Sequence, residues 1–180
     1  MCFEVIEIMN VIYLIIRKLY KIFHSEQYFL SKLKTEAKSV GRGVRVFGQI
    51  SVNNKTSIDE NTAINKLNVI GAGECKIGKY CHIAYGLTVI TSNHNYKGNG
   101  IPYDDKVIEK PVTIGDFVWI GANVTILPGV TIGEGAIIQA GSVVRNDVRS
   151  LAIAGGNPAK EFAARDEEHY LKMKKEGKFF

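Results

Sequence analysis

The chain has 180 residues and a formal net charge of +5 at pH 7, with 46% hydrophobic and 23% charged residues. The length suits one domain with end segments, and the composition excludes a disordered polymer. No array of basic and aromatic residues indicates a nucleic-acid partner, so we expect none. Three cysteines are too few for a disulfide framework, and Cys75 and Cys81 fall at positions expected to point inward. Both features favour a cytoplasmic location.

Residues 1–40 are predicted to form a helical segment. Apolar residues follow helical spacing over about 5–34. The apolar run 5–16 is shorter than the roughly 20 residues needed to cross a bilayer, and Glu7 interrupts it. Two interpretations stay open. The helix packs on protein, or it makes a peripheral membrane contact with basic residues such as Arg17 at the headgroups.

Further along the chain, an apolar residue recurs about every six positions. This period fits neither a helix nor a lone strand, but it fits a short strand and a turn that bury their apolar positions by stacking on copies of themselves. The expected rungs of this ladder are Val46, Val52, Ile58, Ile64, Ile70, Ile77, Ile83, Val89, Ile108, Ile114, Ile120, Ile126, Ile132, Ile138 and Val144. Three faces per coil predict five coils of a mainly β solenoid over residues 41–153.

The ladder is interrupted over residues 91–107, where no rung is found. A segment expelled from so regular a fold is where a functional site is expected. The segment contains His94, and a histidine imidazole is the side chain that most often acts as a general base. Asp104 and Asp105 are candidates to hold the other ring nitrogen, although loop carboxylates are more often simply solvated.

Three motifs resemble one known family. They are IGDFVWIGANVTILPGVTIG at 114–133, AGSVV at 140–144 and GNPAK at 156–160. Together with the histidine-bearing loop, they resemble the hexapeptide-repeat O-acetyltransferases, the maltose, galactoside and polysaccharide acetyltransferase group. The resemblance covers about residues 58–160. It implies a left-handed parallel β-helix, a homotrimer and acetyl-CoA as acetyl donor.

The resemblance also implies roles for individual residues. His94 matches the family's catalytic histidine, which takes the proton of a sugar hydroxyl as that oxygen attacks the acetyl group. The residues expected to bind the donor are Trp119, Ala122, Ala140, Arg145, Asn146 and Lys160. Arg145 and Asn146 stand where the family often has Thr-Lys, so Arg145 could supply the charge there.

The acceptor side is less well defined by the sequence. The residues that could line it are Tyr85, Asn93, Asn65 and Asn68. The family's acidic sugar-binding position falls near Gly71 and is not carried over, which leaves the acceptor sugar open. Residues 154–180 are expected to form an exit turn followed by a short helix over about 166–175.

Three alternatives remain beside a saccharide O-acetyltransferase. The same base could serve an amino-sugar N-acetyltransferase. A zinc hydratase on the same prism would need three histidines around the metal, and the four histidines of this chain include no close pair, so no metal site is expected. A non-catalytic β-helix used for assembly would bind no acetyl-CoA.

Overall fold

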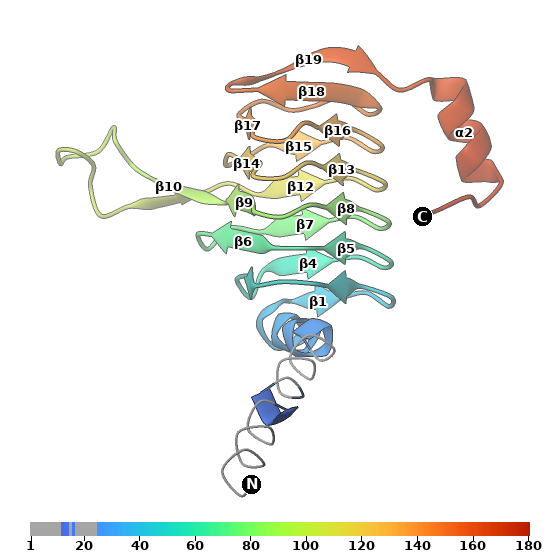
Figure 1. The fold of residues 1–180 in the computed structure, drawn as a ribbon. Coiled ribbons are helices and arrows are strands. Elements are labelled where there is room, and N and C mark those ends of the chain that lie inside the picture. Colours follow the sequence, from blue (N-terminus) through green and yellow to red (C-terminus); the bar gives the residue numbers. More distant parts are fainter. Residues whose placement is uncertain (1–11, 15, 17–24) are drawn as a thin grey trace, which may run out of the picture.

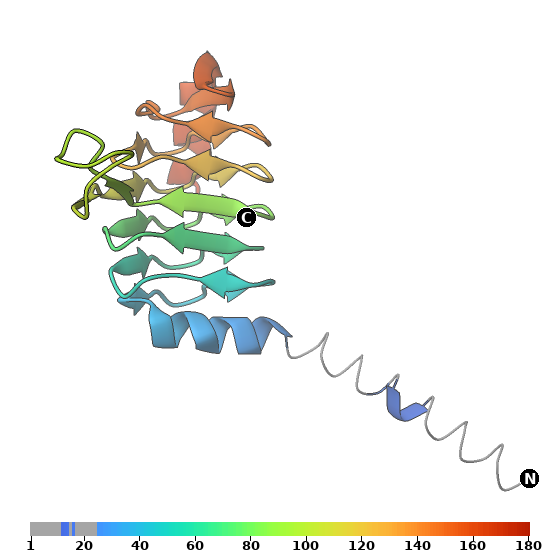
Figure 2. The ribbon, with the colours of Figure 1, turned by 90° about the vertical axis from the view of Figure 1, so that its left-hand side faces the viewer.

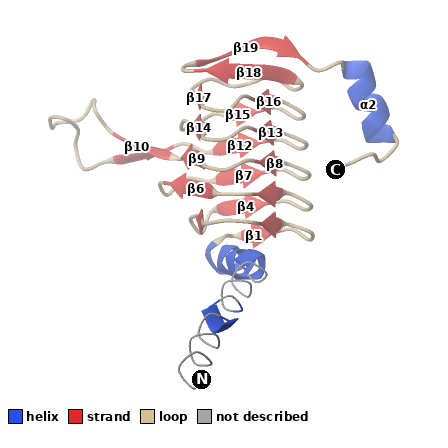
Figure 3. Cartoon of the chain, viewed as in Figure 1, coloured by secondary structure: helices blue, strands red, loops and turns tan. Residues whose placement is uncertain are grey.

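The computed structural model describes residues 12–14, 16 and 25–180. Short strands joined by turns wind repeatedly around one axis, so that segments far apart in the sequence lie one above another (Figures 1 and 3). Apart from the two-stranded sheet of a hairpin described below, the strands form three sheets, which we name faces A, B and C in the order in which the chain visits them. Neighbouring strands within each face are parallel, except for the last pair on face B. The predicted parallel β-helix is therefore confirmed.

The faces have the following members. Face A contains β1 (Ser39–Val40), β4 (Thr56–Ile58), β7 (Cys75–Ile77), β12 (Val112–Ile114) and β15 (Thr131–Ile132). Face B contains β2 (Arg45–Val46), β5 (Ala63–Ile64), β8 (His82–Ile83), β13 (Trp119–Ile120), β16 (Ile137–Ile138), β18 (Ala152–Gly156) and β19 (Ala159–Ala164). Face C contains β3 (Ile50–Ser51), β6 (Leu67–Ile70), β9 (Leu87–Ile90), β14 (Thr125–Ile126) and β17 (Val143–Val144).

The inward positions of the three faces form the core. Ile114 pairs with Ile132 on face A, and both are buried. Ile120 pairs with Ile138 in the same way on face B. Each of these apolar side chains is covered by the coils above and below it, so the repeat residues stabilise the fold only as a stack.

One predicted rung on face C is wrong, and another is only partly buried. Val52 packs against the core without being fully covered, and Ile50, two residues earlier, is fully buried. On β6, Val69 points inward and Ile70 is 48% exposed. The reason is the alternation of side chains along a strand: because Leu67 and Val69 face the core, Ile70 must face solvent.

The expelled segment forms a β-hairpin at the corner where face C meets face A. β10 (Ser92–His94) and β11 (Val107–Glu109) pair antiparallel, and the hairpin projects from the prism at the left of Figure 1. Ile108 was predicted to be a core rung, but it pairs with Asn93 in the hairpin and is exposed. The six-residue spacing could not distinguish a strand that leaves the prism from a rung inside it.

A helix over residues 25–36 closes the N-terminal end of the prism (Figure 2). Leu33 of this helix is fully buried in the core, and Lys32 Nζ donates a hydrogen bond to the Ile50 carbonyl at 2.8 Å. Residues 12–14 and 16 are also helical, and the rest of the helix predicted over 5–34 lies outside the described residues. Among the residues that are described, no helix is both long and apolar enough to cross a membrane.

The C-terminal end differs from the predicted exit turn. β18 is a sixth parallel strand of face B, one coil more than predicted, and β19 pairs with it antiparallel. Helix α2 (Glu167–Lys175) follows beside the corner between faces A and B, at the right of Figure 1. The Asp166 carboxylate caps the helix by accepting a hydrogen bond from the His169 amide at 2.8 Å.

Candidate active site

His94 lies at the end of β10, where the hairpin leaves the prism. It pairs with Val107 of β11, its side chain is exposed, and its ring stacks on Tyr103 with centroids 3.9 Å apart and planes 11° apart. Tyr103 was not among the predicted site residues. Its contact depends on how the hairpin loop folds back, for which the sequence holds no periodic signal.

Asp104 does not orient the histidine. Its carboxylate accepts hydrogen bonds from Asn95 Nδ2 at 2.9 Å and from the Lys106 amide at 3.0 Å, and so closes the hairpin loop. Asp105 is exposed, and within the described part of the chain no hydrogen bond reaches the His94 ring. The aromatic ring of Tyr103 is therefore what fixes the plane of the imidazole in this chain.

Three of the predicted donor-binding positions are gathered along the corner between faces B and C. The Gly141 amide donates to the Ala122 carbonyl at 2.8 Å, which stacks the turn containing Ala140 directly on the turn containing Ala122. A side chain at Gly121 would come within 2.5 Å of the Ala140 amide nitrogen, so only glycine permits this close approach. The Gly156 amide donates to Ser142 Oγ at 3.2 Å and brings the turn before Lys160 to the same corner.

The remaining predicted donor residues lie away from this corner. Trp119 is on the outer side of β13 on face B and is 54% exposed. Arg145 and Asn146 follow β17 at the corner between faces C and A, and both are exposed. The structure thus brings Ala122, Ala140 and the turn before Lys160 together, but not Arg145 and Asn146.

A cavity of about 680 Å³ lies between face B and α2. Its lining residues include Trp119, Phe117 and Tyr170, and none of them comes from the hairpin. Figure 1 shows β10 and β13 on different sides of the prism. A single chain therefore does not bring His94 and Trp119 together.

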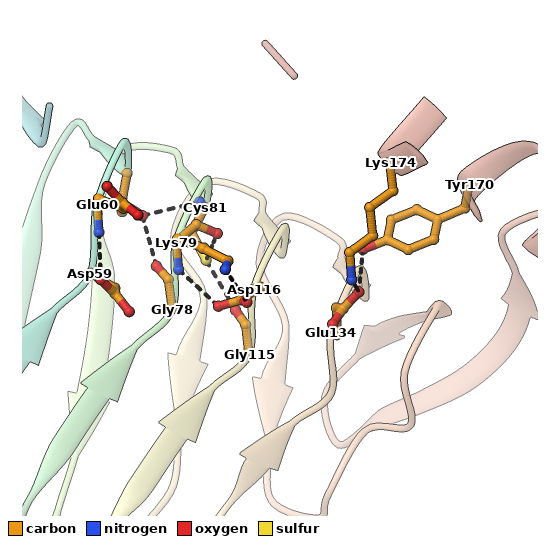
Figure 4. A network of polar contacts seen from close by, with 11 residues as sticks. Asp59, Glu60, Gly78, Lys79, Cys81, Gly115, Asp116, Glu134, Tyr170 and Lys174 are labelled. Carbon is orange, nitrogen blue, oxygen red and sulfur yellow. Dashed lines mark hydrogen bonds and ion pairs between the residues drawn. The ribbon is translucent and has the colours of Figure 1, made fainter. Parts of the chain in front are cut away.

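Helix α2 is anchored to the prism through Glu134 (Figure 4). The Glu134 carboxylate accepts a hydrogen bond from Tyr170 Oη at 2.8 Å and another from Lys174 Nζ. Burial acts to raise the pKa of Glu134, but the hydrogen bonds from Lys174 and Tyr170 and the charges of Lys174 and Lys79 outweigh it, so the pKa lies below the usual value. The carboxylate is therefore ionised at neutral pH and holds α2 in place.

A second, polar cavity of about 490 Å³ lies on the outer side of face C, beside the corner with face B. Two of the predicted acceptor residues, Asn68 and Tyr85, line it. The other two do not: Asn65 Nδ2 donates to the Ile83 carbonyl of the next coil at 3.2 Å, and Asn93 belongs to the hairpin.

Sequence reasoning missed several residues of this polar cavity. They are Gln49, Ser51, Lys66, Thr88 and Asn123. A signal was available, because Lys66, Tyr85 and Asn123 occupy the same corner in successive coils. It became visible only once the register between coils was known.

The two inward-pointing cysteines are confirmed as core residues, since Cys75 and Cys81 are fully buried. Burial raises the pKa of each thiol to about 12, so neither is a thiolate at neutral pH. Within the described ranges, no group of three or more His, Cys, Asp or Glu side chains is arranged to hold a metal ion.

Comparisons with known proteins agree with this architecture. A sequence model described as bacterial transferase hexapeptide (six repeats) matches residues 111–146. The galactoside O-acetyltransferase of Escherichia coli is 34% identical over 122 residues, which cover 66% of this chain and 54% of that protein. A solved maltose O-acetyltransferase from Clostridium difficile is 30% identical, with a TM-score of 0.66, and the match covers 75% of this chain and 73% of that one. A hexapeptide-repeat acetyltransferase from Vibrio cholerae, solved with acetyl coenzyme A, is 26% identical with a TM-score of 0.66 over 76% of each chain.

The chain spans about half the length of the curated relatives it matches. The family model nevertheless matches residues 111–146, which form the coils directly after the hairpin. The length and fold of the chain agree with the solved maltose O-acetyltransferase over about three quarters of both chains. The chain therefore belongs to the hexapeptide-repeat acetyltransferase family.

Proposed function

We propose that this protein transfers the acetyl group of acetyl-CoA to a hydroxyl group of a saccharide. The supporting observation is the division of the site between two surfaces of the chain. His94 ends β10 of the projecting hairpin, while Trp119 is exposed on β13, and Figure 1 shows these two strands on different sides of the prism. The solved relative from Vibrio cholerae has acetyl coenzyme A bound, which supports this donor.

The divided site leads to a homotrimer as the active form. A heterologous contact repeated by rotation closes into a ring, and each copy then offers both of its surfaces to neighbours. The hairpin of one copy reaches face B of the next, so that His94 meets Trp119 across the interface. Each of the three interfaces then holds one complete site.

The chemistry assigned to this site is a direct transfer. Neutral His94 takes the proton of the acceptor hydroxyl while the oxygen attacks the acetyl carbonyl carbon. The carbon–sulfur bond then breaks, and the imidazolium returns its proton to the departing thiolate, which leaves as coenzyme A. Tyr103 stacks against the ring and keeps its plane fixed through both proton transfers.

The test is an assay of coenzyme A release with acetyl-CoA and a panel of neutral sugars, acidic sugars and amino sugars. We expect release with hydroxyl acceptors, and at least about a 100-fold loss of turnover in His94→Ala with unchanged donor affinity. Asn99→Ala changes an exposed residue of the same loop and is the matched control. Undiminished turnover in His94→Ala contradicts the base assignment, and transfer restricted to amines makes the protein an N-acetyltransferase.

The proposal includes two further points about the cellular setting. Action on a polysaccharide precursor would place the protein in the cytoplasm, where acetyl-CoA is made available. Peripheral membrane contact through the N-terminal helix remains a prediction, and most of the residues concerned lie outside the described part of the chain.

A further inference from the structure

We propose that the polar cavity on face C binds an acidic oligosaccharide as the acceptor. We call this cavity the face C groove; its lining residues are Gln49, Ser51, Lys66, Leu67, Asn68, Tyr85, Gly86, Leu87, Thr88 and Asn123. The inference rests on the proposed acetyl transfer and names the class of substrate for it.

The shape of the groove fits a chain of sugars better than a single one. Ser51, Asn68 and Thr88 lie in register on neighbouring strands of face C, and Asn123 adds the turn of a fourth coil. Strands in a sheet are about 4.8 Å apart, so four coils extend over about 14 Å. This is longer than one pyranose ring.

The lining of the groove has the chemistry of a saccharide site. Amide and hydroxyl groups, such as those of Asn68, Thr88 and Asn123, both donate and accept hydrogen bonds, as sugar hydroxyls require. The Tyr85 ring is 58% exposed and offers a flat apolar surface for the C–H face of a pyranose. Gly86 has a φ of +88°, and a side chain there would come within 2.4 Å of Asn123 Oδ1. The absence of a side chain at Gly86 therefore leaves space for the Asn123 amide to line the groove.

Lys66 gives the groove its charge. Its ammonium group lies 5.1 Å from the centroid of the Tyr85 ring and 3.5 Å from Tyr85 Oη. Among the described residues, no carboxylate lines the groove. Over the described residues, no acidic side chain forms an ion pair with Lys66, whereas Lys76 on face A is paired with Glu74 at 3.2 Å. An uncompensated cation above an aromatic platform favours a ligand that carries a negative charge beside a sugar ring.

The position of the groove relative to His94 sets the length of the acceptor. Thr88 in the groove and His94 are six positions apart in the chain, and most of the residues between them belong to strands β9 and β10. Such a segment spans no more than about 21 Å, so a short oligosaccharide is long enough to reach from the groove to the base. His94 is not among the residues that line the groove, so a saccharide with its acidic residue in the groove reaches the base only through a further sugar unit.

The experiment measures binding to the full chain without acetyl-CoA, by calorimetry. The probes are tetragalacturonate, maltotetraose as the neutral chain of equal length, and galacturonate. We expect tetragalacturonate to bind at least about 10-fold more tightly than either other probe. Compared with maltotetraose it adds a charge that Lys66 can hydrogen-bond, and compared with galacturonate it adds the neutral contacts of further sugar units. Added salt should reduce this preference. Equal affinity for the acidic and neutral tetramers, or for the monomer, overturns the proposal.

Variants assign the binding to the groove. Lys66→Gln should remove most of the preference for the acidic tetramer, about 10-fold, while Lys76→Gln should keep it. Tyr85→Ala should weaken both tetramers alike, since it removes the platform and not the charge. An unchanged preference in Lys66→Gln contradicts the role of that lysine.

Two further comparisons separate the possible failures. If UDP-galactose binds more tightly than tetragalacturonate and loses this affinity in Lys66→Gln, the cation serves a phosphate and the oligosaccharide proposal is wrong. His94→Ala should bind tetragalacturonate normally but not acetylate it. If the unmodified protein does not bind tetragalacturonate but still acetylates other sugars, only the groove proposal is wrong. If it binds tetragalacturonate but acetylates no sugar, only the proposed function is wrong.

Discussion

The rings of His94 and Tyr103 stack in the hairpin that leaves the prism, with centroids 3.9 Å apart and planes only 11° apart. The two residues come from opposite parts of the loop, and their contact holds the imidazole without a hydrogen bond from Asp104. Because His94 is otherwise exposed, the stack limits the freedom of its ring. Tyr103 is therefore a positioning residue for the proposed base.

Replacing Tyr103 tests this role. Tyr103→Leu should lower kcat about 10-fold, since small displacements of a reacting group have large effects on rate. The KM for acetyl-CoA should change little. Tyr103→Phe keeps the ring and should restore most of kcat, while Tyr96→Leu alters a 74% exposed tyrosine of the same loop as a control. Equal loss in Tyr103→Leu and Tyr103→Phe would show that ring stacking is not what matters.

Mixed trimers test whether the site is shared between copies. His94→Ala and Trp119→Ala chains should each be nearly inactive alone. In randomly mixed trimers, about a quarter of the interfaces combine an intact His94 from one copy with an intact Trp119 from the next. Activity should then recover to about a quarter of that of the unmodified protein after the two chains are unfolded and refolded together. No recovery, with trimers formed, would place both residues in one chain's site.

Lys160 tests the assignment of the donor to the corner between faces B and C. It is exposed on β19, beside the corner that carries Ala122 and Ala140. Lys160→Ala should raise the KM for acetyl-CoA several-fold, up to about 10-fold, by removing a charge near the donor's phosphates. Lys172→Ala removes a positive charge from an exposed position on α2 and should leave the KM unchanged. If Lys160→Ala and Lys172→Ala have the same KM for acetyl-CoA, Lys160 does not belong to the donor site.

Glu134 tests how α2 is held on the prism. Because its pKa is lowered in the folded protein, the carboxylate contributes stability above the usual pKa of 4.5, and this contribution is lost as the pH falls through the lowered value. Glu134→Gln should reduce the free energy of unfolding by about 1 kcal/mol or less at pH 7, since the group is partly exposed. At pH 3 the difference between the two proteins should shrink.

The measurement for Glu134 is urea unfolding followed by the fluorescence of Trp119, the single tryptophan of the chain. This residue lines the same cavity as Tyr170 of α2, so it reports on the helix contact. Glu176→Gln removes an ion pair within the C-terminal segment and is the control. A difference between Glu134→Gln and the unmodified protein that does not depend on pH would exclude a role for the ionised carboxylate.

Much of the fold could be predicted because the burial of a rung is a local property. Ile114, Ile120 and Ile126 each face inward for the same reason, and their spacing alone indicated a stacked solenoid. The same reasoning failed at Ile70 and Ile108, where an apolar residue lies on the outer side of a strand or in the hairpin. Spacing records which residues are apolar, but not which side of the chain they occupy.

The sequence by itself determined the repeating coil, the expelled segment and His94 as the candidate base, because each depends on residues near one another in the chain. Only the tertiary structure decided what lies beside them. The stack of Tyr103 on His94 joins two parts of the hairpin loop. The anchoring of α2 by Glu134 and the groove containing Lys66 and Tyr85 join residues from different coils or elements. Such contacts depend on how loops fold back and on which residues of successive coils lie above one another. An insertion such as the hairpin changes the sequence separation between these residues from one coil to the next.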